Sequence, residues 1–106
     1  MSHLSSLLRF HLGKANAITG KELAKRLGQD DDRAIREEIR GLISQGIPIA
    51  ASTQPPYGYY IVETMDEAEQ YMRQLKNRLI NDALRRRDFK KAAERTLNKE
   101  AQLSFL

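Results

Sequence analysis

The chain has 106 residues, the size of a single domain. Hydrophobic residues make up 41% and charged residues 30%, a balance that favours a soluble, partly helical globular protein and excludes a disordered chain. Cysteine is absent, which excludes a disulfide framework and a thiolate metal site. The net charge of +4 favours an acidic partner.

The charge is distributed unevenly along the sequence. Residues 1–28 carry a net +4, residues 29–71 a net −6, and residues 72–106 a net +6. We therefore expect the two ends to attract a polyanion and the middle to resist it.

Membrane, secretion and cofactor signals are weak. No apolar run approaches the roughly 20 residues of a membrane-spanning helix, and MSHLSSLLRFHLG lacks the layout of a signal peptide. We expect a cytoplasmic protein without membrane contact. His3 and His11 have no acidic or sulfur ligand nearby, so we expect no metal and no other cofactor.

Three short helices are predicted before residue 46. Leucine spacing predicts the first over 3–12. A capping box of Thr19 and Glu22 predicts the second over 20–27, and a helical apolar repeat predicts the third over 31–45. The residues expected to face the core are Leu4, Leu7, Leu8, Leu23, Ala24, Leu27, Ile35, Ile39, Leu42 and Ile43.

A β-hairpin and a long helical region follow. Segments 47–52 and 57–63 favour β-structure, and we expect Pro55, Pro56 and Gly58 to shape the tip between them. A second capping box, Thr64 to Glu67, predicts a helix from Met65 past Leu84, which the basic stretch after it either continues or follows as a separate helix. One apolar stripe of this helix contains Ala68, Met72, Leu75, Leu79 and Ala83.

This order resembles a winged helix–turn–helix. ITGKELAKRLG, DRAIREEIRGLISQGIPI and YGYYI, all within residues 18–62, are similar to the positioning helix, the recognition helix and the second wing strand of the biotin-operon repressor and related regulators. The resemblance implies a mainly helical α+β fold, with a winged-helix domain over 1–63. We expect a basic helical extension over 64–100 and an exposed tail over 101–106. The resemblance also implies binding of double-stranded DNA by a small prokaryotic or phage transcriptional regulator.

Three arginines of the predicted third helix are the main candidates for DNA contact. At about 100° per residue, Arg33, Arg36 and Arg40 fall on one exposed flank. Arginine can form two parallel hydrogen bonds with guanine or with phosphate. The alternative is ordinary surface pairing, because Asp32 and Glu37 lie at helical-neighbour spacing from these arginines.

Three aspartates, Asp30 to Asp32, precede the arginines. Carboxylates here stabilise the positive end of the helix dipole, and we expect one of them to cap free N–H groups. They also place negative charge where the tip of a recognition helix meets DNA. Whether this acidic start prevents reading of the groove stays open from the sequence.

Other candidate DNA contacts come from three regions, and for each residue alone the alternative is a solvated surface position. They are Lys21 and Lys25 in the second helix, Gln54 and Tyr57 at the wing tip, and Arg85, Arg86 and Arg87 in the basic extension.

The C-terminal region suggests protein partners. The apolar stripe of the last helix either pairs with a second copy, giving a homodimer, or packs on its own domain. The final QLSFL resembles the peptide with which replication proteins bind a sliding clamp. This implies a partner-binding tail and an alternative function, a replication-associated adaptor. The tail consists of Gln102, Leu103, Ser104, Phe105 and Leu106.

Catalytic motifs are not evident. The sequence contains no Gly-rich phosphate loop, no Ser motif of the nucleophile-elbow type and no apparent nucleophile–base pair. We therefore expect a protein that is not an enzyme.

Overall fold

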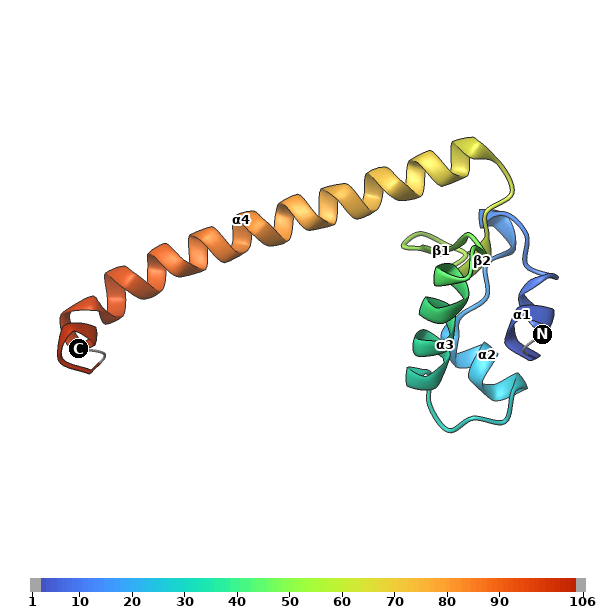
Figure 1. Ribbon diagram of the computed structural model, residues 1–106, viewed down its shortest axis with the longest axis horizontal. Helices are drawn as coiled ribbons and strands as arrows, with labels where there is room; N and C mark the ends of the chain where they lie inside the picture. Colours follow the sequence, from blue (N-terminus) through green and yellow to red (C-terminus); the bar gives the residue numbers. More distant parts are fainter. Residues whose placement is uncertain (1–2, 105–106) are drawn as a thin grey trace. The chain divides into compact units, whose positions relative to one another are not determined.

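The computed structural model describes residues 3–104, with side chains described over 3–97. The chain divides into two compact units, Met1–Tyr71 and Met72–Leu106. The first unit has three short helices, a 3₁₀ turn and a two-stranded hairpin, and the second belongs to the long helix α4, Met65–Ser104 (Figure 1). The expected mainly helical α+β class is confirmed.

The three predicted short helices are present, and each is shorter than expected. They are α1 (His3–Leu8), α2 (Gly20–Arg26) and α3 (Arg33–Ser44). The first ends earlier than the predicted 3–12 because the next residues pair with the hairpin. The carbonyl of His11 accepts from the N–H of Ile61 at 2.9 Å, and the N–H of Gly13 donates to the carbonyl of Ile61 at 2.9 Å.

At the start of helix α2, one of the two hydrogen bonds of the predicted capping box is present. The N–H of Glu22 donates to the Thr19 hydroxyl oxygen at 3.1 Å, which satisfies one free donor of the first turn. The Glu22 carboxylate instead pairs with Arg26 Nε at 3.2 Å. The hydroxyl cap is therefore confirmed, and the carboxylate supports the helix through an i,i+4 pair.

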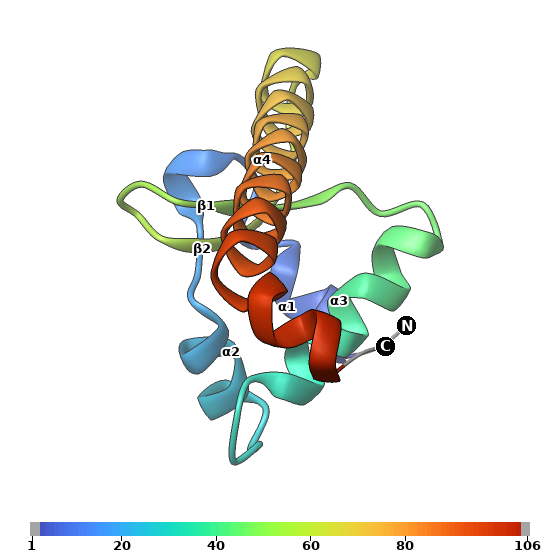
Figure 2. The same cartoon turned by 90° about the vertical axis from the view of Figure 1, so that its left-hand side faces the viewer.

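The hairpin consists of β1 (Ile49–Ser52) and β2 (Gly58–Ile61). The strands are antiparallel, with Ile49 opposite Ile61 and Ser52 opposite Gly58 (Figure 2). The connecting residues contain a cis peptide bond between Pro55 and Pro56. Tyr60 is buried, and its neighbours in β2 are half-buried, so the aromatic strand contributes to the core as predicted.

Strand β2 is paired on both edges. On the side away from β1, Ile18 and Tyr59 exchange two backbone hydrogen bonds of 2.9 and 2.7 Å, and Leu12 bridges Ile61. The segment between α1 and α2, which includes the 3₁₀ turn η1 (Lys14–Asn16), therefore lies beside β2.

Gly58 is required by this close approach. Its φ is +121°, and a Cβ there would overlap the backbone of Ile18 and lie 2.6 Å from the nitrogen of Thr19. Gly58 directly follows the hairpin turn and forms the last pair before it, opposite Ser52. It is the first residue of β2, and its missing side chain lets the strand beside it approach.

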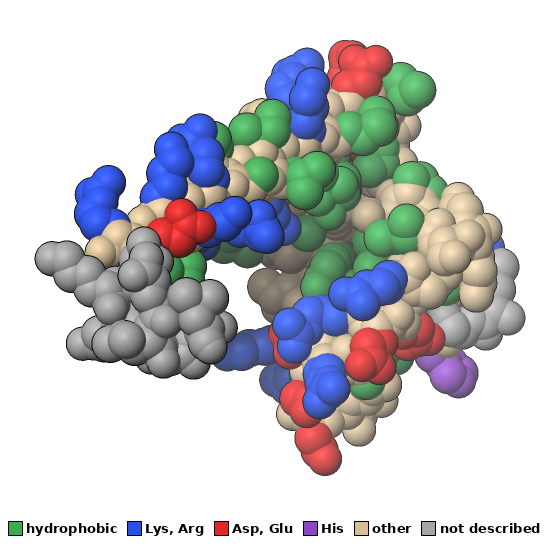
Figure 3. All heavy atoms as spheres, turned by 60° about the vertical axis from the view of Figure 1, so that its left-hand side comes forward, with side chains coloured by type: hydrophobic (Ala, Val, Ile, Leu, Met, Phe, Trp, Pro, Cys, Tyr) green, Lys and Arg blue, Asp and Glu red, His purple; other side chains and the backbone are tan. Residues whose placement is uncertain are grey.

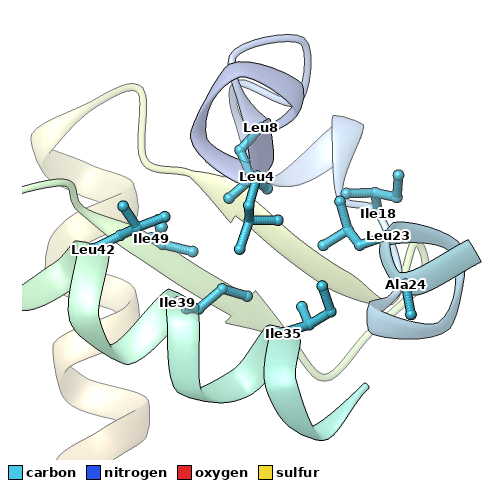
Figure 4. Packing of buried hydrophobic residues seen from close by; sticks show 9 residues of the cluster. All are labelled: Leu4, Leu8, Ile18, Leu23, Ala24, Ile35, Ile39, Leu42 and Ile49. Atoms are coloured by element: carbon cyan, nitrogen blue, oxygen red, sulfur yellow. The ribbon is translucent and has the colours of Figure 1, made fainter. Parts of the chain in front are cut away.

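The core of the first unit forms where the three helices meet the hairpin (Figure 4). Leu4, Leu8, Leu23 and Ile35 are almost completely buried. The nine buried residues of the cluster are Leu4, Leu8, Ile18, Leu23, Ala24, Ile35, Ile39, Leu42 and Ile49, with Leu7, Leu27, Ile47, Tyr59 and Ile61 packed against them.

Ile43 departs from the predicted core. It is 46% exposed, whereas Leu42 beside it is buried. Successive helical residues point about 100° apart, so Ile43 falls at the edge of the arc that Ile35, Ile39 and Leu42 occupy.

Helix α4 is continuous from Met65 to Ser104, so the basic stretch continues the helix. Its first turn is capped by Thr64, whose hydroxyl oxygen accepts from the N–H of Glu67 at 3.2 Å. The Glu67 carboxylate accepts from the N–H groups of Lys14 and Glu63, each at 2.8 Å. The start of α4 is thereby bonded to η1, far away in the sequence.

Candidate nucleic-acid interface

Helix α3 presents an arginine flank, which we define as Arg33, Arg36 and Arg40. All three side chains are exposed. Together with Glu37 they line a shallow depression of about 220 Å³. The helical arithmetic therefore placed these three side chains together correctly, along one side of α3 that begins at its first residue, Arg33.

The carboxylates beside the arginine flank are held loosely. Arg33 Nε lies 3.7 Å from a Glu37 oxygen, and Arg36 Nη2 lies 3.8 Å from an Asp32 oxygen. Both pairs are well exposed, and pairs of this kind contribute about 0.2–1 kcal/mol. Among the described residues, Arg40 forms no salt bridge within 4 Å. All three guanidinium groups are therefore available to an external anion at small cost.

The acidic start of α3 has structural roles. An Asp31 side-chain oxygen accepts from the N–H of Arg33 at 3.0 Å and so caps the helix. Asp32, besides pairing with Arg36, lies against the start of α2, where a Cβ on Gly20 would be 3.3 Å from the Asp32 carboxylate. Asp30 is exposed. Asp31 thus satisfies one free N–H group at the helix start, as the sequence predicted for one of the three aspartates, whereas the N-cap residue Asp32 makes no side-chain cap hydrogen bond.

Tyr59 connects the hairpin to this corner. The ring lies 3.4 Å from where a Cβ on Gly20 would be, so β2 and α2 meet here. Burial raises the pKa of the Tyr59 hydroxyl, the Arg36 charge lowers that pKa, and the Asp32 charge raises it, with a net upward shift. Tyr59 therefore stays neutral.

The other candidates in the first unit are also exposed. Lys21 and Lys25 lie on α2, and Gln54 and Tyr57 lie in the hairpin turn. Ser52 orders this turn, since its hydroxyl donates to the Gln54 carbonyl at 2.6 Å. None of these four residues contributes to the depression along α3.

One contact near the hairpin turn was not predicted from the sequence. Lys14 Nζ, from η1, donates to the Gln54 side-chain oxygen at 3.3 Å. The two residues are 40 positions apart, and nothing local signals that they meet. The pairing of β2 with the segment between α1 and α2 brings them together and adds a cation to the hairpin turn.

The basic residues of α4 belong to the second unit. Arg85, Arg86 and Arg87 are exposed, and Arg87 Nη2 lies 3.3 Å from an Asp88 oxygen. Lysine, arginine and hydrophobic side chains are all visible on the surface of α4 (Figure 3). The side chains of the QLSFL tail lie outside the described residues, so the clamp-binding hypothesis stays a prediction.

Comparison with protein-family models, curated proteins and solved structures finds no match for this chain. Three short helices followed by a two-stranded antiparallel hairpin are compatible with a winged-helix layout. Over the described residues, no helix has both the length and the apolar character needed to cross a membrane. The same residues include no group of three or more His, Cys, Asp or Glu suited to a metal ion.

Proposed function

We propose that this chain binds double-stranded DNA as a winged helix–turn–helix protein and acts as a small prokaryotic or phage transcriptional regulator. The observation that carries the proposal is the arginine flank of α3, with three exposed guanidinium groups and only weak, solvent-exposed counter-charges. The element order, with α3 in the place of a recognition helix and a hairpin after it, supports the same function.

The energies favour DNA over the internal pairs. An exposed ion pair is worth less than about 1 kcal/mol, whereas one bidentate arginine–guanine contact discriminates by about 1–3 kcal/mol. A phosphate contact adds the release of condensed counterions. Exchanging Glu37 or Asp32 for DNA is therefore favourable for Arg33 and Arg36.

The acidic start sets how α3 would approach the groove. Asp30 and Asp31 place negative charge at the tip, which the phosphate backbone repels. The arginine flank runs along the side of α3, so contact through the side keeps Asp30 and Asp31 farther from the phosphates. Asp32 and Glu37 lie beside the flank and would give up their pairs with Arg36 and Arg33. Lys21, Lys25 and Lys14 would then add phosphate contacts from α2 and from beside the hairpin turn.

The test begins with selection of bound sites from a random DNA pool, followed by fluorescence titration of an enriched duplex at several salt concentrations. The variant Arg33→Gln/Arg36→Gln/Arg40→Gln is compared with Arg73→Gln/Arg78→Gln/Arg95→Gln, which removes the same charge from exposed positions of α4. We expect the α3 variant to lose about 100-fold or more in affinity and the control less than about tenfold.

Two results would contradict the proposal. One is the absence of DNA binding by the wild-type chain even at about 50 mM salt, where phosphate contacts are strong. The other is an equal loss in the two triple variants, which would show that net charge alone decides binding and that α3 has no special role.

A further inference from the structure

The second unit carries an apolar stripe that a single helix cannot bury. Met72, Leu75 and Leu79 are 55%, 40% and 71% exposed. With Ala83 they occupy an arc of about 80° on α4, at about 100° per residue. A continuous apolar arc of this kind is typical of a helix that packs against another helix.

Further along the helix the same face carries two cations, before Ala93 and Leu97, which lie 18 positions after Leu75 and Leu79, make it apolar again. Eighteen residues make about five full turns, so residues 18 positions apart point in the same direction. Arg86 and Lys90 therefore continue the direction of Ala68 and Met72, and both side chains are exposed. Any partner of the apolar stripe also meets these two cations.

Parallel pairing of α4 with α4 of a second copy would bring like charges together on this face. Arg86 would lie across from Arg86 and Lys90 across from Lys90, with Arg85, Arg87 and Lys91 close by. Like charges that face each other across a helix pair are destabilising. The repulsion would fall directly on the line of contact.

An antiparallel copy matches both charge and shape. Glu69 lies nine residues before Arg78, and Arg87 lies nine residues after it. Because Glu69 and Arg87 are 18 residues apart, their side chains point in the same direction and lie on the same side of the contact. Glu69 of each helix would thus lie beside Arg87 of the other helix.

The apolar residues give the same centre independently. Leu75 and Leu79 are placed symmetrically about Asn77, and Met72 and Ala83 about the point between Asn77 and Arg78. The centres of the charge pairs and of the apolar pairs therefore agree to within one residue, and the facing positions to within two residues, about 3 Å along the axis.

We propose that α4 pairs with α4 of a second copy in antiparallel orientation, centred at Asn77 and Arg78. In this dimer Leu75 packs on Leu79 of the second copy, and Arg87 faces its Glu69. The proposal is independent of DNA binding, because the residues that carry it all lie on α4.

Sedimentation equilibrium of the full chain tests association. Leu79→Glu places a carboxylate in the contact, whereas Asn81→Glu places one on the opposite side of the same helix, and both positions are exposed. We expect the wild type to dimerise with a dissociation constant below about 100 μM. Leu79→Glu should raise this dissociation constant about 100-fold, because each copy loses a leucine that the dimer buries. Asn81→Glu should change it less than about threefold.

Circular dichroism of both variants checks that the helices remain. A monomeric wild type at 100 μM would overturn the proposal, as would equal weakening by the two variants. Dimerisation that Leu79→Glu leaves unchanged would locate the interface elsewhere and equally overturn it.

Disulfide cross-linking tests the relative orientation of the two α4 helices. Because the chain contains no cysteine, only the introduced residues can form a disulfide. A tagged Met72→Cys chain is mixed with an untagged Ala83→Cys chain and oxidised. The antiparallel dimer brings these two positions together, so we expect the mixed disulfide to predominate. Predominance of Met72→Cys or Ala83→Cys cross-linked to itself would show parallel pairing and overturn the proposal.

A charge exchange tests the register. Arg87→Glu should weaken the dimer at low salt, since it faces Glu69 of the second copy, and adding Glu69→Arg in the same chain should restore it. A dimer that Arg87→Glu strengthens would be the parallel one, because that change relieves its like-charge contact.

Discussion

Gly58 is the residue on which the pairing of β2 depends most directly. Its φ of +121° disfavours any side chain, and the backbone of Ile18 occupies the place of a Cβ. We expect Gly58→Ala to lower the free energy of unfolding by about 2 kcal/mol or more. Urea denaturation measures it, with Gly41→Ala on the open surface of α3 as the control. Equal small effects from both changes would show that β2 can move away from Ile18.

Glu67 makes stability depend on pH. Hydrogen bonds from the N–H groups of Lys14 and Glu63 hold the pKa of its carboxyl below the usual 4.5, although burial partly opposes this. A carboxylate with a lowered folded pKa stabilises the protein above its unfolded pKa. That contribution is lost as the pH falls through the folded pKa.

We expect Glu67→Gln to cost about 1 kcal/mol at pH 7, because two hydrogen bonds to a charged acceptor are weakened. The difference from the wild type should shrink as the pH falls below 4.5. Urea denaturation between pH 7 and 3 measures this, and Asp66→Asn in the same helical turn controls for the helix dipole. A difference that does not change with pH would contradict the role assigned to this carboxylate.

At the scale of the elements, α3 offers a matched pair of isoleucines. Ile39 is 5% exposed and Ile43 is 46% exposed. We expect Ile39→Ala to cost about 2–5 kcal/mol and Ile43→Ala less than about 1 kcal/mol. Thermal or urea denaturation of the two variants measures the contrast. Similar losses would mean that Ile43 becomes buried in solution, as the sequence pattern predicted.

Local signals explain which elements the sequence predicted well. The two threonine caps and the i,i+4 spacing of Ile35 and Ile39 act within one or two helical turns, so the starts of α2 and α4 and most of the buried face of α3 could be found. The side-by-side arginine flank follows from the same arithmetic.

Contacts between distant residues explain what the sequence missed. Helix α1 ends early because His11 and Gly13 bond to Ile61, and the sequence of 3–12 contains no sign of that pairing. The contact of Lys14 with Gln54 depends on the same pairing. Such bonds form between segments whose separation no local pattern encodes.

At the scale of the molecule, the two units differ in how their stability arises. Every residue of the buried cluster lies between Leu4 and Ile49, inside the first unit. We therefore expect a chain of residues 1–71 to keep the free energy of unfolding of the full chain to within about 1 kcal/mol in dilute solution. Urea denaturation measures this. A chain of residues 1–63, which lacks Glu67, should be weaker, and an unfolded 1–71 chain would show that the core needs the rest of α4.

The hydrogen bonds from Lys14 to Glu67 and from Gly13 to Ile61 also determine when the protein can fold during its synthesis. The partners of η1 are made some fifty residues later, so a growing chain cannot close this domain when its three small helices first leave the ribosome. Their leucines and isoleucines stay open to water until the strand around Tyr59 and the start of α4 have emerged. We therefore expect the nascent chain to fold late and in a single step, once the residues up to Glu67 have left the ribosome.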